Sequence, residues 1–364
     1  MYIRSLQSVH TSGACAPHFR RLCSTLQVPV LHTSGAGAPH FRCRCSTLQV
    51  PVIHISGACD PHLRCLCSTL QHPIDCEEMS LYKINYANGS SASVSIMGIP
   101  FGDFDRTGHW AIWCISKMFE AAQLQVLLNG FLDYKHIIDE DAALSIIKQQ
   151  ISLDSKLRSL SLKSPIKLKF DSEIKQLKKT SVVSVVKLKN ENTDEILGEN
   201  VIKLVRIGRK TRRSIPFPEW FHEKYSSFIG TPGHPGTEKE ELPKIPQNAF
   251  EYITSPGYSD EDMNRHINQS SYIQFCMDAA THASLNGYYD HYTKDMCLYP
   301  SLQWTITYVG ESLANDELNI FTWQSENCPE QICFAMLVNG QKIIFHASTI
   351  FGKEADEPRF HHKL

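Results

Sequence analysis

Residues 258–266 have the sequence YSDEDMNRH, and 157 positions earlier residues 101–109 have the sequence FGDFDRTGH. Both stretches keep the spacing Asp-x-Asp-x-x-x-His. The matched residues are Asp103, Asp105 and His109 in the first stretch and Asp260, Asp262 and His266 in the second. The same offset continues without a gap to Asn129-Gly130 in one copy and Asn286-Gly287 in the other. An ungapped run of this length indicates an internal duplication.

Each copy begins with a β segment (81–97 and 249–255), followed by a turn-rich loop and one helix. The helices are predicted from apolar residues at three- and four-residue steps. These stripes are Ile112, Ile115, Met118, Phe119, Ala122 and Val126 in the first copy, and Tyr272, Ile273, Cys276, Ala279, Ala280 and Ala283 in the second. Asn268, Ser270 or Ser271 can cap the start of the second helix, and Gly287 suits the left-handed position that ends it.

The pattern after each helix changes to strands. They are predicted at 144–152, 166–175, 181–190 and 199–208 in the first copy, and at 301–309, 317–325, 331–340 and 341–352 in the second. Asn339-Gly340 is a strong hairpin signal. One helix covered by an antiparallel sheet, twice over, predicts an α+β fold made of two sheets that each wrap one helix.

The predicted organisation has five parts. Residues 1–77 form an N-terminal extension, 78–228 the first domain, 229–247 a Pro- and Gly-rich linker, 248–353 the second domain and 354–364 a tail. The extension contains three near-identical 22-residue segments, each with prolines that interrupt any long helix. Its regular Cys and His residues leave zinc binding open, and its arginine-rich, acid-poor composition leaves a mitochondrial transit peptide open. The interpretation that we favour is a disordered low-complexity segment.

The composition limits the classes of function. The chain has 364 residues, 42% of them hydrophobic, so it can form two domains with real cores. Its formal net charge of −2 gives no general reason to expect nucleic-acid binding. No apolar run is long enough for a membrane span. Eight of the 13 cysteines precede residue 77 and the other five show no disulfide spacing, which favours a reducing compartment. A cytoplasmic location is therefore favoured, with a mitochondrial one left open.

The duplicated loop can carry chemistry because it leads into the start of a helix. Free backbone N–H groups and the positive end of the helix dipole lie there, where they can hold an oxyanion. In the second copy this loop delivers a carboxylate, an amide and an imidazole from Asp262, Asn264 and His266. These groups are suited to acyl transfer, although a loop of Asp and Asn residues can also serve only as a turn and a cap.

A resemblance favours the catalytic interpretation. SDEDMNRHINQSSYI (259–273) resembles the signature of plant and bacterial acyl-ACP thioesterases, Asp-x-Asp-x-Asn-x-His-[Val/Ile]-Asn-Asn-x-x-Tyr-Ile. This resemblance implies a tandem double hotdog in which Asp262, Asn264 and His266 are catalytic. The family's strand motif Tyr-x-x-Glu-Cys is similar to Tyr308-Val-Gly-Glu311-Ser312, which adds Glu311. The chain departs from the pattern at Ser312, where the family has Cys, and at Gln269, where it has Asn.

The resemblance also implies a role for each residue. Asp262 attacks the thioester or activates water, His266 and Glu311 position that water and move its proton, and Asn264 orients the Asp or the His. Backbone N–H groups around Asn268, Gln269 and Ser270 hold the oxyanion, Ser312 lends possible support, and neither metal nor cofactor is needed. In the first copy Asp105, His109 and Asp154 remain but Thr107 replaces the Asn, so a degenerate, acyl-binding site is expected there.

Charge is distributed unevenly along the chain. Residues 156–213 carry 16 basic and six acidic side chains, whereas 248–364 carry six basic and 15 acidic ones. The two regions could simply attract each other, or Arg209, Lys210, Arg212 and Arg213 could bind an anionic carrier such as acyl carrier protein or CoA. The expected function is release of a fatty acid from acyl-ACP or acyl-CoA, and a homodimer is compatible with it. The alternatives are a non-catalytic acyl-thioester binding protein and a hotdog hydratase or dehydratase.

Overall fold

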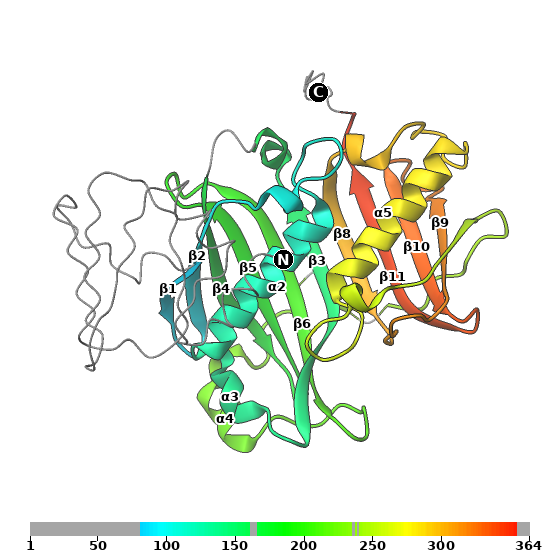
Figure 1. Ribbon diagram of the computed structural model, residues 1–364. Coiled ribbons are helices and arrows are strands. Elements are labelled where there is room, and N and C mark those ends of the chain that lie inside the picture. Colours follow the sequence, from blue (N-terminus) through cyan, green and yellow to red (C-terminus); the bar gives the residue numbers. More distant parts are fainter. Residues whose placement is uncertain (1–80, 161–165, 235–236, 239, 355–364) are drawn as a thin grey trace, which may run out of the picture. The chain divides into compact units, whose positions relative to one another are not determined.

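Both copies lie on one antiparallel sheet of 11 strands in the computed structural model, which describes residues 81–160, 166–234, 237–238 and 240–354 (Figure 1). The predictions for residues 1–77 and for the tail from residue 355 lie outside these ranges. The α+β class is confirmed. The expectation of two separate sheets is wrong, because strands from the two copies pair with each other and make the sheet continuous.

The strands of the first half are β1 (Tyr82–Ala87), β2 (Ser91–Met97), β3 (Ala142–Leu153), β4 (Lys167–Leu177), β5 (Ser181–Asn190) and β6 (Ile196–Gly208). Those of the second half are β7 (Phe250–Thr254), β8 (Ser301–Tyr308), β9 (Leu318–Gln324), β10 (Gln331–Val338) and β11 (Lys342–Phe351). The four strands predicted after each helix are all present. The segment 81–97 forms two strands, because Asn88 turns the chain between them and accepts hydrogen bonds from the Ser90 and Ser91 N–H groups.

The order of strands repeats the duplication seen in the sequence. Across the sheet the order is β1-β2-β4-β5-β6-β3-β8-β11-β10-β9-β7. Outward from the middle, the first half therefore runs β3, β6, β5, β4, β2 and the second half runs β8, β11, β10, β9, β7. Corresponding strands occupy corresponding places, and only β1 has no counterpart among the described residues.

The two halves meet where β3 pairs with β8. Residues 148–152 of β3 face residues 303–307 of β8, and Ile151 lies opposite Trp304. Trp304 is fully buried and stacks on Phe334 of β10, with ring centroids 5.6 Å apart. The buried apolar residues of both halves form one continuous cluster, so the core crosses this junction.

The helices α2 (Ile112–Leu128) and α5 (Gln269–Leu285) lie on the same face of the sheet and contact each other (Figure 1). Every residue of the two predicted apolar stripes is buried. Asn268 caps α5, because its side-chain oxygen accepts a 2.9 Å hydrogen bond from the Ser270 N–H. Gly287 follows α5 with a φ of 75°, as predicted, and Gly130 follows α2 in the same region with a φ of 115°. Short helices α3 (Tyr134–Ile137) and α4 (Glu219–Lys224) occur only in the first half of the described chain.

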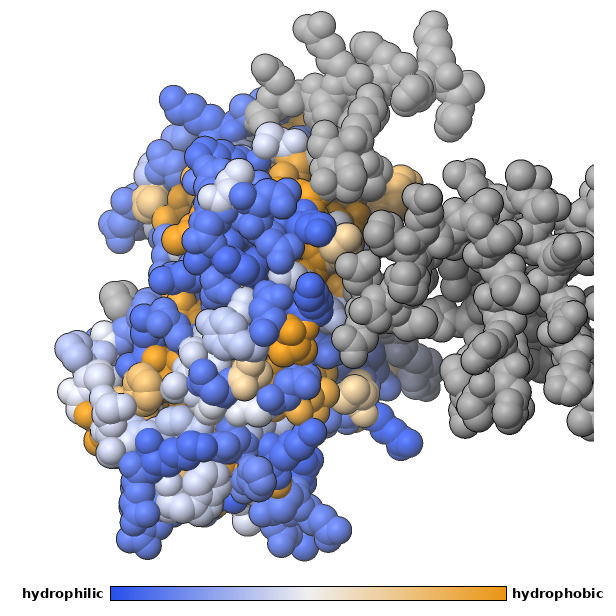
Figure 2. All heavy atoms as spheres, turned by 90° about the vertical axis from the view of Figure 1, so that its left-hand side faces the viewer, coloured by the Kyte–Doolittle hydropathy of each residue, from blue (hydrophilic) through white to orange (hydrophobic). Residues whose placement is uncertain are grey.

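The outer edge of the first half carries some exposed apolar surface. Tyr86 of β1 and Met97 of β2 are each about half exposed. Figure 2, which views the molecule from this side, shows small hydrophobic patches separated by hydrophilic surface. Within the described residues, no helix has the length and apolarity required to cross a bilayer.

The junction strand gives a first prediction. Trp304→Ala should lower the free energy of unfolding by about 3–5 kcal/mol, because it opens a cavity under both halves. Trp304→Phe is the matched control: it keeps a ring against Phe334 and removes an indole N–H that is buried without a hydrogen-bond partner. In chemical denaturation, Trp304→Phe should lose clearly less free energy of unfolding than Trp304→Ala. Equal losses in the two variants would contradict a role for ring packing at this junction.

Candidate active site

The loop before α5 closes into a tight turn that presents the predicted site residues. Glu261 and Ile267 form an isolated bridge, the Asp262 N–H donates to the His266 carbonyl at 2.9 Å, and the Arg265 N–H donates to the Asp262 carbonyl at 3.0 Å. Arg265 has a φ of 61°, in the left-handed region. Its counterpart in the first copy is Gly108, with a φ of 81° and the equivalent hydrogen bond to Asp105. The turn is therefore the same in both copies, although only one has the glycine that suits it.

Asp262 and Asn264 form the first pair of the site. One carboxylate oxygen of Asp262 accepts the Asn264 backbone N–H at 2.7 Å, and the other accepts the Asn264 side-chain amide at 3.1 Å. Both oxygens are therefore held by a single residue, which fixes the orientation of the carboxylate. Asp262 is partly exposed and Asn264 is exposed, so a substrate can approach them.

His266 and Glu311 form the second pair. The His266 Nε2 lies 3.3 Å from a Glu311 carboxylate oxygen, which orients the imidazole. Glu311 lies just after β8, so the pair links the loop before α5 to the strand at the junction. The other oxygen of Glu311 is paired with Arg212, which follows β6 in the first half. No side-chain hydrogen bond or ion pair between described residues joins this pair to Asp262 and Asn264.

The start of α5 is tied to the first half through Glu120 of α2. The Asn268 side chain uses its oxygen to cap α5 and donates its N–H to Glu120 at 3.1 Å. Burial raises the pKa of the Glu120 carboxyl, an effect that hydrogen bonds from Asn268 and Gln269 partly offset and that the nearby charge of Asp262 reinforces. Glu120 is thus a third acidic group near the pair of Asp262 and Asn264, and it comes from the other half of the molecule.

The predicted oxyanion donors are only partly available. The Asn268 N–H donates to the Asp260 carbonyl at 2.8 Å, and the Ser270 N–H is used by the cap. The Gln269 N–H, in contrast, has no hydrogen-bond partner within the described part of the chain. Of the three groups expected from the sequence, the one at Gln269 is therefore the donor that remains for a ligand.

Ser312 does not face the site. Its side chain is 1% exposed and its hydroxyl lies 2.9 Å from the Tyr272 hydroxyl. Its backbone N–H donates to the same hydroxyl at 3.1 Å, and its carbonyl accepts the Ile267 N–H at 3.1 Å. Ser312 therefore connects the end of β8 to α5 and to the loop before α5. A nucleophilic role at this position is not supported by its surroundings.

The first-copy residues make a different arrangement. One oxygen of Asp105 accepts the Thr107 N–H and hydroxyl at 2.8 and 2.7 Å and the His109 N–H at 3.2 Å. The Thr107 hydroxyl and the Arg158 guanidinium lie 2.8 and 3.1 Å from the His109 Nδ1. Asp154 only caps the short turn after β3, by accepting the Lys156 N–H at 2.8 Å. Arg158 thus lies beside the histidine of the first copy, whereas Glu311 fills that place in the second.

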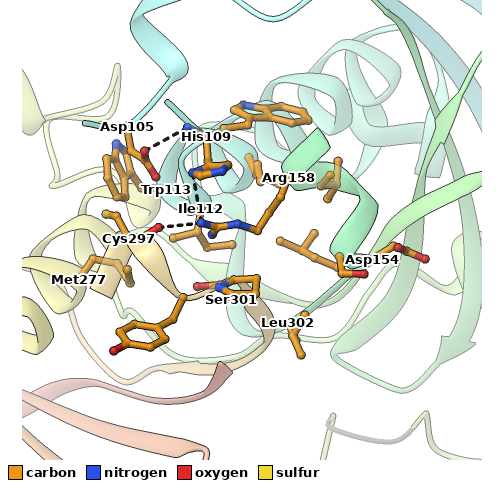
Figure 3. Close-up of a pocket in the computed structure, with 17 residues that line it drawn as sticks. Asp105, His109, Ile112, Trp113, Asp154, Arg158, Met277, Cys297, Ser301 and Leu302 are labelled. Atoms are coloured by element: carbon orange, nitrogen blue, oxygen red, sulfur yellow. Dashed lines mark hydrogen bonds between the residues drawn. The ribbon is translucent and has the colours of Figure 1, made fainter. Parts of the chain in front are cut away.

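A pocket adjoins this first-copy cluster (Figure 3). Its empty volume is about 500 Å³, which includes its mouth to solvent. Both halves line it: His109, Trp113 and Arg158 come from the first, and Met277, Ser301 and Leu302 from the second. Within the described ranges, no group of three or more Cys, His, Asp or Glu side chains is arranged to hold a metal ion.

Of the four residues predicted to bind a carrier, one has a second role. Arg212 pairs with Glu311, while Lys210 pairs at 3.2 Å with Asp141 in an exposed contact. Arg209 donates to the Asp139 carbonyl at 3.0 Å. The attraction between the basic and acidic regions is therefore real at Arg212. It was not possible to assign Arg212 to Glu311 from the sequence, because 99 residues separate them.

Glu120 and Arg158 were missed by the sequence analysis. Glu120 follows the buried Phe119 at the edge of the apolar stripe, and the duplication places Met277 at its position in the second copy. This difference between the copies was the available signal for Glu120. Arg158 lies just after Asp154 in the segment where the two copies have few matching residues, so it gave no such signal.

Solved structures show which class of protein has this fold. An acyl-ACP thioesterase from Bacteroides thetaiotaomicron matches 72% of this chain and 98% of its own, with a TM-score of 0.56 and 16% identity. The 12:0-ACP thioesterase from Umbellularia californica matches 72% of this chain and 97% of its own, with a TM-score of 0.55 and 15% identity. No protein-family model matches the chain, and neither does any curated protein sequence.

This chain is therefore a protein with the hotdog-type fold of acyl-ACP thioesterases. The relationship predicted from residues 259–273 is confirmed at the level of the fold alone, because the sequence identities to these two structures are only 16% and 15%.

Proposed function

We propose that the chain is an acyl-thioester hydrolase that releases a fatty acid from acyl-ACP or acyl-CoA, and that its two halves are two hotdog domains, 78–228 and 248–353. The observation that carries this proposal is the pair of contacts at the start of α5. There, Asn264 holds both oxygens of Asp262, and Glu311 holds the imidazole of His266. The similarity in fold to acyl-ACP thioesterases supports the choice of substrate class.

The proposed reaction uses each group where it lies. Asp262 takes a proton from a water molecule, whose oxygen attacks the thioester carbonyl and forms a tetrahedral oxyanion. The Gln269 N–H and the positive end of the α5 dipole stabilise that oxyanion. When the intermediate collapses, the C–S bond breaks and His266 gives a proton to the departing thiolate. In the alternative scheme Asp262 itself attacks, and water then hydrolyses the resulting anhydride.

Catalysis is expected in the second copy and not in the first. Asp262→Ala and His266→Ala should each lower kcat by about 10²–10⁴-fold, the usual scale for a lost general base or acid. Asp105→Ala and His109→Ala are the matched controls and should leave kcat within a few-fold. Both pairs are measured for hydrolysis of an acyl-chain series on ACP and on CoA, with thermal melts in parallel.

The opposite result, loss in the first-copy variants alone, would show that the site assignment is wrong. A wild-type protein that binds acyl thioesters without hydrolysing them would favour a binding protein. Hydration of an enoyl thioester or dehydration of a hydroxyacyl thioester would favour a hotdog hydratase or dehydratase.

Glu120 is proposed to position the start of α5 for this reaction. Glu120→Ala removes the acceptor of the Asn268 amide, so the cap and the Gln269 N–H should shift, and kcat should fall about tenfold or more with little change in KM. Glu120→Gln keeps an oxygen acceptor at the same place and should recover most of the activity. Equal losses in kcat for Ala and Gln would instead mean that the charge of Glu120 is required.

Arg209, Lys210 and Arg213 are proposed to bind the anionic carrier. Reversing these three to Glu should raise KM several-fold and weaken its dependence on salt, while kcat stays similar. Arg212 is left intact in this variant because it contacts Glu311. The control reverses three exposed lysines elsewhere, Lys83, Lys342 and Lys353, so that net charge changes equally. If KM rises to the same extent in both variants, only the overall charge matters and the docking surface is disproved.

A further inference from the structure

The pocket beside the first-copy motif has a chemistry that catalysis in the second copy does not use. Its polar centre is the Arg158 guanidinium, which projects between His109 and the segment 297–302 (Figure 3). The Nη2 group of Arg158 donates to the carbonyls of Cys297 and Leu298, both at 3.2 Å. Among the described residues no carboxylate forms an ion pair with Arg158, and its Nη1 group makes no hydrogen bond. A partly buried cation therefore lines the pocket with donor capacity to spare.

His109 adds a second donor. The His109 Nδ1 lies 2.8 Å from the Thr107 hydroxyl and 3.1 Å from the Arg158 guanidinium, which can only donate; in the tautomer that accepts from Arg158, Nδ1 carries no proton. Burial lowers the pKa of His109, and the charge of Arg158 lowers it further, which keeps the ring neutral near pH 7. A neutral ring that accepts at Nδ1 carries its proton on Nε2. Within the described chain that Nε2 has no hydrogen-bond partner, so it offers an N–H to a ligand.

Each of the two carboxylates in the lining has one oxygen engaged within its own loop or turn. One oxygen of Asp105 accepts hydrogen bonds from the Thr107 N–H, the Thr107 hydroxyl and the His109 N–H of its own loop. Asp154 is exposed and caps the turn that begins at Ser155. The rest of the lining is largely apolar and includes Trp113, Met277 and Leu302.

Comparison of the two copies explains why this pocket differs from the active site. In the second copy, α2 contributes Glu120 beside Asp262, and Glu311 lies beside His266. In the first copy the corresponding helix residue is Met277, and Arg158 lies beside His109. The two supporting carboxylates of the second copy, Glu120 and Glu311, thus have a thioether and a cation in their places, while Asp105 keeps the place of Asp262. The pocket keeps the position of an acyl site but favours an anion.

We propose that this pocket binds the carboxylate of a free fatty acid, with its oxygens on Arg158 Nη1 and His109 Nε2 and its first methylene groups against Trp113, Met277 and Leu302. The choice of a fatty acid rests on the proposed function, because that acid is the product of the reaction. The geometry of the pocket, and the binding that it predicts, do not depend on hydrolysis.

The test is direct binding of octanoate to the full-length protein, followed by the fluorescence of Trp110 and Trp113, which both line the pocket. Octanoate should give a saturable change that octylamine and octanol do not give at the same concentrations. Arg158→Gln should weaken binding about ten- to hundredfold, the scale of a lost charge-assisted hydrogen bond, and Arg158→Lys should weaken it less. Met277→Glu places a carboxylate in the pocket, as Glu120 does in the other copy. It should abolish octanoate binding by charge repulsion even though Arg158 is intact.

Two controls separate this site from the proposed active site. Lys342→Gln removes one exposed positive charge away from the pocket, and His266→Ala disables the second copy; both should bind octanoate like the wild type. Thermal melts confirm that each variant is folded. The proposal is overturned if octanoate does not bind, if octylamine binds equally well, if Arg158→Gln leaves binding unchanged, or if His266→Ala removes it. A protein that binds octanoate through Arg158 but hydrolyses no thioester would disprove the proposed function and leave this site standing.

Discussion

The pairing of β3 with β8 is the constraint on which both sites depend. Five consecutive residues of each strand are in register across this junction, and the core continues beneath it through Ile151 and Trp304. Because the sheet is continuous there, α2 and α5 lie next to each other on its surface. Each motif loop then faces the helix of the other half, so Glu120 reaches Asn268 and Met277 reaches the pocket beside His109. Neither site would be complete in an isolated half.

The duplicated loop has the same backbone turn in both copies but different side-chain contacts. Both copies use the same turn, in which the N–H of the second Asp of the motif donates to the His carbonyl, at 2.8 Å in one copy and 2.9 Å in the other. Asn264 in one copy spans both oxygens of Asp262, whereas Thr107 in the other donates its hydroxyl to a single oxygen of Asp105. An amide has a donor and an acceptor in a rigid plane, and a hydroxyl has neither that reach nor that geometry. A change of one residue type thus separates a carboxylate held at both oxygens from one held at a single oxygen.

Features set by local rules could be predicted from the sequence. The helix ends followed from Asn-Gly pairs, and the buried stripes from the spacing of apolar residues. The strands followed from alternation and from a hairpin signal at Asn339-Gly340. Features set by contacts between distant residues could not be predicted. The union of two expected sheets depends on strand edges that carry no distinguishing pattern, and the partner of Glu311 lies 99 residues earlier, at Arg212. Because Asn268 caps α5, the Ser270 N–H is used and the Gln269 N–H stays free. The sequence allowed three residues as the cap, so it could not predict which N–H group would remain free.

Electrostatics accounts for why the two copies differ as they do. Asp262 is held by Asn264 and lies close to the acidic Glu120, and it has no ion-pair partner among the described residues. Arg212 pairs with Glu311 instead. In the first copy Arg158 lies beside His109; burial lowers the pKa of this histidine, and the charge of Arg158 lowers it further. We therefore propose turnover on one side of the β3–β8 junction and anion binding on the other.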